Sequence, residues 1–271
     1  MQIEQPIISS TSNPTIKTIR KLRSRKGREQ EASFWVEGIR LVGEAVQQGA
    51  QIELLVVANE LLTSQFAQDL VSDLQHRGVP CLPVTAAVFN SLSTKDGPQG
   101  LGAVVRQCWY PLPSEFAAED VWVALAEVQD PGNLGSIIRT ADAVGCLGLI
   151  LVGNCTDPYD PAAVRGSMGS LFALRLVKAS EQEFLSWRAA RKATIVGTSG
   201  AAKHHYRQVG YPRPLVLLSG SEREGLSAPL MEACDQLVGI PMVGRADSLN
   251  LAVATSVVLY EVFDQLSQPT T

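Results

Sequence analysis

Residues 121–145 constrain the fold of this chain more than any other stretch, because they read as a buried strand, a tight turn and a helix in direct succession. The apolar run at residues 121–128 predicts the strand, and a proline and two glycines that follow it predict the turn. Residues 136–144 then carry apolar side chains at helical spacing. A helix that begins after such a turn has free backbone N–H groups at its N-terminus, which favours an anionic or polar ligand there.

Two polar side chains stand out in this stretch. We expect Asn133 in the turn and Arg139 on the first turns of the helix, so that both can face one cavity. Arg139 is the less usual of the two, because a cation is not favoured near the positive end of a helix dipole. Its position therefore indicates a task that offsets this cost.

Apolar runs and helical patterns alternate through the second half of the chain. Four further apolar runs predict buried strands, at residues 147–152, 193–198, 215–219 and 237–240. Helical patterns lie between most of them, at residues 136–144, 162–172, 181–191, 226–232 and 249–266. Strands that are apolar on both faces and separated by helices predict an α/β fold with a mostly parallel sheet and helices on both faces.

The first half of the chain predicts a smaller α/β domain. Its strands are expected at residues 34–36, 52–57, 79–84 and 101–107, and its helices at residues 38–48 and 61–75, with a short helix through residue 92. Two prolines within residues 108–119 predict a linker. The predicted order is a basic arm at residues 1–28, the small domain at 29–107, the linker at 108–119 and the large domain at 120–271.

Composition excludes several classes of protein. The 271 residues are 45% hydrophobic and 18% charged, which is typical of a globular protein with a sizeable core. No stretch approaches the roughly 20 apolar residues of a membrane helix, and the N-terminus lacks the apolar core of a signal peptide, so we expect a cytoplasmic protein. Five scattered cysteines and three histidines form no ligand spacing, so neither a disulfide framework nor a metal site is expected.

The net charge of −4 hides a basic N-terminal arm. Residues 1–30 hold seven basic and two acidic residues, a net charge of +5, whereas the remainder holds 16 basic and 25 acidic residues, a net charge of −9. Ile16, Ile19 and Leu22 recur at three-residue steps, which predicts a helix with one apolar stripe and basic flanks. The flanks are either a solvated face or a phosphate contact, and the charge pattern leaves both open.

Three predicted strands end in unusual loops, at the edge of the sheet where ligands bind in doubly wound folds. The first loop holds Asn133. The second, residues 220–225, has two glycines that bracket charged residues, and the third, residues 241–250, carries a proline, a glycine and the sequence Ser-Leu-Asn. Single turns between strand and helix often contain such residues. Three of them at equivalent ends of one sheet predict a binding site.

The residues of these loops match three motifs of one family. The motifs are N-x-G-x-x-x-R-x-A, then G-x-E-x-x-G after a strand, then I-P-M followed by S-L-N. They stand here at Asn133, Gly135, Arg139, Ala141, Gly220, Glu222, Gly225, residues 240–242 and residues 248–250. Together with residues 164–170, they make residues 120–266 resemble the SpoU (TrmH-type) branch of the SPOUT RNA methyltransferases. Residues 34–38 and 100–104 resemble, more loosely, the ribosomal-protein-like RNA-binding domain of that family.

The resemblance implies transfer of a methyl group from S-adenosylmethionine to an RNA ribose 2′-hydroxyl. It also implies a homodimer and a trefoil knot formed by the carboxyl-terminal segment. The extra domain and the arm are similar to those of members that act on ribosomal RNA, so ribosomal RNA is expected ahead of transfer RNA. A non-catalytic RNA-binding or assembly factor of the same fold is the other alternative, and the intact motif residues argue against it.

The resemblance also assigns roles to single residues. Cofactor binding is implied for Thr198, Leu218, Gly220, Ile240 and Leu249. Arg139 is the proposed catalytic residue of the family. Because a guanidinium group rarely deprotonates in proteins, we expect a charged Arg139 that stabilises the developing alkoxide or grips the adjacent phosphate, in preference to a general base. Asn133, Ser248 and Asn250 are expected to orient the nucleotide and Arg139, and Glu222 either holds Arg139 or caps its own loop.

RNA contacts are expected mainly from the arm. The candidates are the basic residues Lys17, Lys21, Arg23, Arg25, Lys26 and Arg165. No P-loop, dinucleotide-binding glycine motif or nucleophile elbow is present in the sequence, which argues against the enzyme classes that use them.

Overall fold

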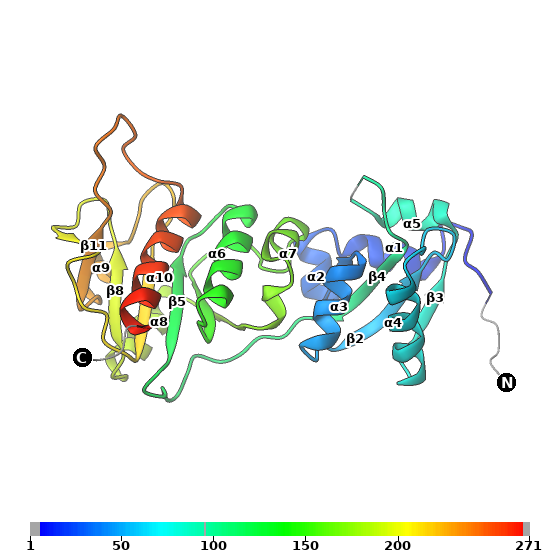
Figure 1. Ribbon diagram of the computed structural model, residues 1–271, viewed down its shortest axis with the longest axis horizontal. Helices are drawn as coiled ribbons and strands as arrows, with labels where there is room; N and C mark the ends of the chain where they lie inside the picture. Colours follow the sequence, from blue (N-terminus) through cyan, green and yellow to red (C-terminus); the bar gives the residue numbers. More distant parts are fainter. Residues whose placement is uncertain (1–5, 95, 268–271) are drawn as a thin grey trace. The chain divides into compact units, whose positions relative to one another are not determined.

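The computed structural model describes residues 6–94 and 96–267 and divides the chain into two compact units (Figure 1). Unit 1 comprises Met1–Gln107 together with Tyr159–Val164, and unit 2 comprises Cys108–Pro158 together with Arg165–Thr271. No helix in the described part of the chain is long and apolar enough to cross a membrane. The assignment of six residues from the middle of the sequence to unit 1 is a feature that no sequence pattern predicted.

Unit 1 is built on a four-stranded sheet of order β1-β4-β2-β3. Its strands are β1 (Ser33–Glu37), β2 (Ile52–Val57), β3 (Cys81–Pro83) and β4 (Leu101–Arg106). β4 pairs antiparallel with both β1 and β2, and β2 pairs parallel with β3. The helices of this unit are α1 (Pro14–Lys21), α2 (Arg25–Glu31), α3 (Ile39–Gln47), α4 (Gln65–His76) and α5 (Ala86–Leu92). The predicted small α/β domain is therefore present.

The basic arm folds as two helices and not as the single helix that its sequence predicted. Ser24 separates them, because its hydroxyl accepts from the Gly27 N–H at 3.1 Å and so caps the start of α2. The predicted apolar stripe is nevertheless correct. Ile16, Ile19 and Leu22 are at most 3% exposed and pack in the core of unit 1 with β1 and α5. This burial fixes α1 on the sheet.

Unit 2 is a seven-stranded sheet of order β7-β6-β5-β10-β8-β11-β9 in which every pairing between named strands is parallel. The strands are β5 (Val121–Ala126), β6 (Gly148–Val152), β7 (Arg175–Ala179), β8 (Thr194–Thr198), β9 (His204–His205), β10 (Leu215–Ser219) and β11 (Gln236–Gly239). The central strands β5, β6 and β10 are buried along their length except for half-buried Val121 at the start of β5, as their unbroken apolar sequences predicted.

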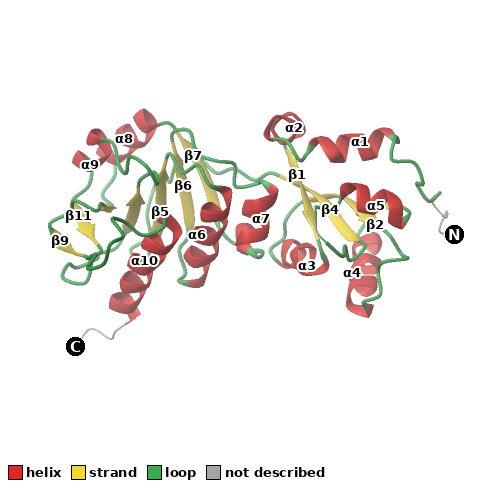
Figure 2. Cartoon of the chain, turned by 90° about the horizontal axis from the view of Figure 1, so that it is seen from above, coloured by secondary structure: helices red, strands yellow, loops and turns green. Residues whose placement is uncertain are grey.

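Helices cover both faces of this sheet (Figure 2). α6 (Pro131–Ala143) and α10 (Leu251–Ser267) pack together on one face, and α8 (Glu181–Ala189) and α9 (Ala228–Glu232) cover the other. The remaining helices are α7 (Pro161–Ser167) and the short 3-10 turn at Ser170–Phe172. The predicted doubly covered, mostly parallel sheet is confirmed.

Two edge strands were missed at the sequence level. β7 begins with exposed Arg175 and contains exposed Lys178, so it lacks the continuous apolar run of the inner strands. β9 is only two residues long, His204 and His205, and a pair of residues has no period to detect. Each of them pairs with only one other named strand, which relaxes the need for apolar side chains.

The helix after β5 begins five residues earlier than predicted, at Pro131. The Asp130 carboxylate accepts from the Asn133 N–H at 2.7 Å and caps the helix, and proline suits its first position. Asn133 therefore lies in the first turn of α6 and not in a loop. Arg139 lies near the middle of the 13-residue helix. It is therefore not close to the positive end of the helix dipole, and the prediction that its charge is disfavoured there is wrong.

Residues 240–250 return the chain from β11 to α10, which packs on α6 and β10. Figure 1 shows this return as a long loop that projects from unit 2. The threading that a trefoil knot requires stays a prediction.

Candidate functional site

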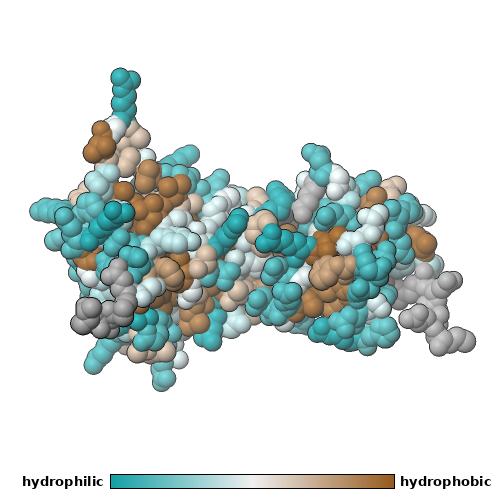
Figure 3. All heavy atoms as spheres, viewed as in Figure 1, coloured by the Kyte–Doolittle hydropathy of each residue, from teal (hydrophilic) through white to brown (hydrophobic). Residues whose placement is uncertain are grey.

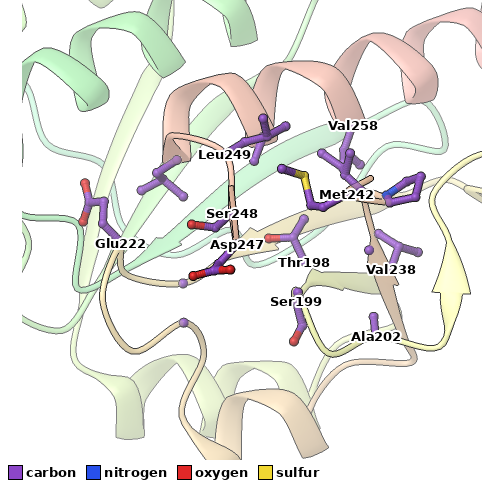
Figure 4. Close-up of a pocket in the computed structure, with 18 of the residues that line it drawn as sticks. Thr198, Ser199, Ala202, Glu222, Val238, Met242, Asp247, Ser248, Leu249 and Val258 are labelled. Carbon is purple, nitrogen blue, oxygen red and sulfur yellow. The ribbon is translucent and has the colours of Figure 1, made fainter. Parts of the chain in front are cut away.

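A cavity of about 700 Å³ opens at the carboxyl ends of the central strands of unit 2 (Figure 4). Its walls come from the loops after β8, β10 and β11 and from the first turns of α10. Six predicted site residues line it: Thr198, Gly220, Glu222, Ile240, Ser248 and Leu249. Two of the three predicted loops, those after β10 and β11, therefore line this cavity, whereas the predicted loop at Asn133 does not, and the loop after β8 forms the third wall.

Leu218 is the exception among the predicted cofactor-binding residues. It is 0% exposed and packs with the buried cluster that contains Trp187 and Leu230. Because side chains alternate along a strand, Leu218 faces the side of the sheet covered by α8 and α9, whereas Ser219 faces α10. Leu218 supports the sheet and does not line the cavity.

The second loop is closed tightly by its own backbone. The Ser221 N–H donates to the Gly225 carbonyl at 3.0 Å, and the Gly225 N–H donates back to the Ser221 carbonyl at 3.1 Å. A Cβ at Gly220 would lie 2.1 Å from the Gly225 carbonyl carbon, so only glycine fits there. The requirement for glycine in the predicted motif thus has a steric cause within the loop itself.

Hydrogen bonds join the three motifs, and one of the side chains involved, Glu222, also lines the cavity. Asn133 Nδ2 donates to Glu222 Oε1 at 2.9 Å, and Asn250 Nδ2 donates to Asn133 Oδ1 at 2.9 Å. One side chain from each loop therefore takes part in a single chain of amide and carboxylate groups. Glu222 accepts from Asn133, so of the two roles left open for it, the contact with Arg139 is not the one that the structure shows.

The two asparagines are held by helix capping. Asn250 Oδ1 accepts from the Ala252 N–H at 2.9 Å and the Val253 N–H at 3.3 Å, so it caps the start of α10. Its Oδ1 is committed to the helix and its Nδ2 is left to donate to Asn133. The backbone of Asn133 is fixed in turn by the cap at Asp130. Local helix starts thus position both groups.

Arg139 stands apart from this network. It is exposed, and within the described part of the chain its side chain makes no hydrogen bond or ion pair. A second cavity of about 460 Å³ is lined by Asn133, Ser136 and Asn250, among others, but Arg139 lines neither cavity. Six residues of α-helix turn the side-chain direction by about 120°, so Asn133 and Arg139 do not share one face. Arg139 is nevertheless the only lysine or arginine in residues 107–164.

Some cavity residues were not predicted. His204 and His205, interpreted from the sequence as surface imidazoles, line the cavity together with Met242 and Asp247. His205 Nδ1 faces the Arg207 N–H at 3.1 Å and its ring stacks on Tyr206. No motif marked the two histidines, because β9 reaches the site through pairing with β11 at a distance in sequence. Met242 stands in the predicted I-P-M motif, which assigned it no role.

The predicted RNA contacts of unit 1 divide into two groups. Arg23 donates to the carbonyls of Ser91 and Ser93 at 2.8 and 3.2 Å, at the end of α5, and Arg25 pairs with Glu29 at 3.0 Å. By contrast, the side chains of three exposed lysines have no hydrogen-bond or ion-pair partner among the described residues: Lys17, Lys21 and Lys26. The sixth candidate, Arg165, is exposed on α7 in unit 2.

Arg28 of the arm is not available to a ligand. Its side chain is 2% exposed and lies 3.4 Å from the Asp160 carboxylate, within unit 1. The same guanidinium donates to the carbonyls of Leu22 and Arg23 at 3.0 Å each. One of the seven basic residues of the arm is therefore structural, since arginine can satisfy several backbone carbonyls at once.

None of the five cysteines forms a disulfide. Burial raises the pKa of Cys146 to about 12, of Cys155 to about 11 and of Cys234 to about 12. These thiols are therefore protonated at neutral pH. Among the described residues, no group of three or more His, Cys, Asp or Glu side chains could hold a metal ion.

Family comparisons agree with the geometry. The sequence model of the SpoU rRNA Methylase family matches residues 120–260, and that of the MRM3-like substrate binding domain matches residues 13–103. A 23S rRNA (uridine(2479)-2′-O)-methyltransferase of Streptomyces viridochromogenes is 35% identical over 90% of this chain and 87% of its own length. The 23S rRNA (guanosine(2553)-2′-O)-methyltransferase RlmP of Bacillus subtilis is 30% identical over 94% of this chain and 98% of its own length.

A solved structure is similar along nearly the whole chain. The AdoMet-bound rRNA methyltransferase from Sinorhizobium meliloti has a TM-score of 0.89 and 38% sequence identity, and the match covers 97% of this chain and 99% of that one.

Proposed function

The chain belongs to the SpoU rRNA methylase family, and from that premise we propose that it transfers a methyl group from S-adenosylmethionine to a ribose 2′-hydroxyl of ribosomal RNA. The family, the enzyme class and the cofactor predicted from the sequence are confirmed. The observation that carries the proposal is the chain of hydrogen bonds from Glu222 through Asn133 to Asn250, because Glu222 lines the large cavity while Asn133 and Asn250 line the second one.

The cavity suits S-adenosylmethionine in size and chemistry. Its volume lies within the range of about 300–1,000 Å³ that is usual for small-molecule sites. Val238, Met242, Leu249 and Val258 give it apolar walls, and backbone groups of the closed loop at Gly220 supply fixed polar contacts. When bound there, the cofactor supplies an activated methyl group, so the protein has to position the acceptor and control charge.

Each motif residue has a role in that positioning. Asn133 and Asn250 hold each other and orient the ribose, and Glu222 fixes the orientation of the Asn133 amide by accepting from its Nδ2. Ser248 lines the cavity one residue away from Leu249, where it can donate to the substrate. Arg139 remains charged and stabilises the alkoxide that develops as the hydroxyl loses its proton, or grips the adjacent phosphate.

The RNA is captured by unit 1 in this proposal. The match to a substrate-binding domain at residues 13–103 and the three exposed lysines of the arm, Lys17, Lys21 and Lys26, support it. Cations without intramolecular partners are the ones that can neutralise phosphates, since the others already have partners. Transfer RNA remains the alternative substrate, and the ribosomal RNA substrates named for the relatives favour ribosomal RNA and a cytoplasmic site of action.

A homodimer is also part of the proposal. α10 exposes Val253, Tyr260 and Phe263 at 49%, 53% and 44%, and Figure 3 shows apolar surface gathered over this helix. The second cavity joins two of these residues to the Asn133–Asn250 pair, so a second copy seated there would lie next to the site. The double variant Tyr260→Glu/Phe263→Glu should be monomeric by light scattering. A dimer that is unchanged in mass would remove α10 from the interface.

Methyl transfer from labelled S-adenosylmethionine tests the proposal. Unmodified ribosomal RNA and transfer RNA are assayed separately, and any labelled product is mapped by nuclease digestion. We expect a ribose-methylated nucleotide from ribosomal RNA alone. Product from transfer RNA alone would show that transfer RNA, and not ribosomal RNA, is the substrate. Cofactor binding without product from either RNA would support the non-catalytic alternative.

A further inference from the structure

A buried serine at the end of β10 receives hydrogen bonds from two threonines. The Thr198 hydroxyl donates to Ser219 Oγ at 3.1 Å, and the Thr255 hydroxyl donates to the same oxygen at 3.1 Å. Ser219 is 1% exposed and Thr255 is completely buried. The three residues belong to β8, β10 and α10, so one hydroxyl joins the three elements from which the cavity walls rise.

The direction of these bonds decides what Thr198 offers to a ligand. A hydroxyl has one proton and two lone pairs. Thr198 commits its proton to Ser219, so its oxygen presents only lone pairs on its other sides. Both acceptor positions of Ser219 are filled by the two threonines, which leaves Ser219 no lone pair for a ligand. Thr198 alone of the three lines the cavity.

The neighbours of Thr198 indicate which part of a ligand meets it. Figure 4 shows Val238, Met242 and Val258 on one side of Thr198 in the wall of the cavity, and Ser248 and Asp247 on the other side. The carboxylates of the cavity, Glu222 and Asp247, come from other loops. An apolar surface with one fixed acceptor suits the adenosine part of S-adenosylmethionine, whereas its charged ammonium and carboxylate groups suit the polar loops.

We propose that Ser219 orients Thr198 as a fixed hydrogen-bond acceptor that selects the adenosine part of the methyl donor through its amino or ribose hydroxyl donor. The inference rests on the proposed function, because it takes S-adenosylmethionine as the ligand of this cavity. Thr198 is the specificity-determining residue and Ser219 is a positioning residue. The ring nitrogens of adenine cannot donate and therefore do not meet Thr198.

Binding of S-adenosylhomocysteine to the full chain, measured by calorimetry, tests the two residues. Thr198→Val removes the acceptor at nearly constant volume and should weaken binding about fivefold, the usual worth of one neutral hydrogen bond. Thr198→Ser keeps the hydroxyl and should bind within twofold of the unaltered protein. Ser219→Ala should weaken binding severalfold although it does not line the cavity, because the Thr198 hydroxyl is then free to rotate.

A matched control separates positioning from a general loss of stability. Thr140 and Ser256 form a similar hydroxyl pair between α6 and α10 at 2.9 Å, and Thr140 does not line the cavity. Thr140→Val should therefore lower the melting temperature without changing the affinity for S-adenosylhomocysteine. Equal losses of affinity in Thr140→Val and Ser219→Ala would overturn the positioning role.

Ligand analogues identify the donor. S-adenosylhomocysteine analogues with a dimethylated adenine amino group, a 2′-deoxyribose or a 3′-deoxyribose each lack one donor. One of them should lose affinity for the unaltered protein but bind Thr198→Val no more weakly than the parent ligand does. If instead a deaza analogue that lacks a ring acceptor shows this pattern, Thr198 donates and the proposal is wrong. Failure of the unaltered protein to bind S-adenosylhomocysteine would refute the proposed function itself. Normal affinity in both Thr198→Val and Ser219→Ala would refute this inference alone.

Discussion

The motif residues of unit 2 and the basic arm of unit 1 both carried strong sequence signals, but the two signals differ in how they relate to the structure. In unit 2, Asn133, Glu222 and Asn250 come from three segments that are distant in sequence and meet in one hydrogen-bonded chain. In unit 1, basic residues that lie close together in sequence differ in their environment, since Arg28 is buried and Lys26 is exposed. A motif of defined spacing predicted a site, whereas a count of charges did not separate ligand contacts from structural ones.

The difference has a physical cause. The carboxyl ends of parallel strands meet at one edge of a sheet, so short loops there are brought together by topology. Charge alone gives no such constraint. An arginine can bond to several backbone carbonyls and remain buried, as Arg28 does, whereas a lysine on a solvated helix face keeps its charge available. The following predictions test this contrast.

Arg139→Ala should have the largest effect. Loss of its charge should lower the rate of methyl transfer by about 10²–10³-fold, the usual cost of removing a group that stabilises a developing oxyanion. Because Arg139 lines neither cavity, the affinity for S-adenosylhomocysteine should stay within twofold. An equal loss of transfer and cofactor binding would show that Arg139 acts through the cavity and not on the substrate.

Arg28→Ala should destabilise unit 1 without a direct effect on RNA contacts. The variant leaves two buried carbonyls and the Asp160 carboxylate without their partner, so unfolding should become easier by about 2–4 kcal/mol. Chemical denaturation measures this change, and the salt dependence of RNA binding should be unaltered below the unfolding transition. A changed salt dependence in the folded variant would place Arg28 at the RNA.

Asn250 offers a way to separate capping from catalysis. Asn250→Asp keeps the cap of α10, because a carboxylate also accepts from the Ala252 and Val253 N–H groups, but it removes the donor to Asn133. We expect it to retain its melting temperature and to lose about tenfold in transfer rate. Asn250→Ala should lose both the rate and about 1 kcal/mol of stability. Full activity in Asn250→Asp would make the bond to Asn133 dispensable.

Removing the three lysines together should weaken RNA binding but not folding. Lys17→Ala/Lys21→Ala/Lys26→Ala loses up to three phosphate contacts, so the slope of log K against log salt should become shallower by about 2–3. Arg23→Ala serves as the matched control, because its guanidinium is engaged with the end of α5. It should lower the melting temperature and leave the slope nearly unchanged. A slope that becomes shallower in Arg23→Ala but not in the triple lysine variant would show that Arg23, and not the lysines, contacts the RNA.

The smallest expected effect is a difference in the rate at which exposed and buried cysteines are alkylated. Cys108 is exposed at the start of unit 2, whereas burial raises the pKa of Cys146, Cys155 and Cys234 to about 11–12. At pH 8 these three thiols are protonated and unreactive, and their labelling should rise only toward pH 11. Mass spectrometry after brief alkylation should therefore find Cys108 modified first. Early modification of Cys146 in the native protein would show that the core of unit 2 opens readily.

The sequence predicted the parallel sheet, the cavity loops and the family, because buried strands and glycine turns have strong local patterns. It failed where structure depends on partners far away in sequence. Leu218 was assigned to the cavity although strand alternation turns it to the opposite face, and the start of α6 was misplaced because the capping role of Asp130 was not recognised. The two hydrogen bonds that Ser219 accepts from Thr198 and Thr255 could not be predicted, since these side chains belong to three different elements and form no motif.

The central claim is that unit 2 performs the transfer while the arm of unit 1 captures the RNA. The most direct measurement is the rate of methyl transfer at saturating ribosomal RNA for the unaltered protein, for Arg139→Ala and for the triple lysine variant. We predict that the lysine variant reaches the full rate once RNA is saturating, and that Arg139→Ala stays slow at every RNA concentration. A triple lysine variant that remains slow at saturating RNA, or an Arg139→Ala protein rescued by more RNA, would contradict the account.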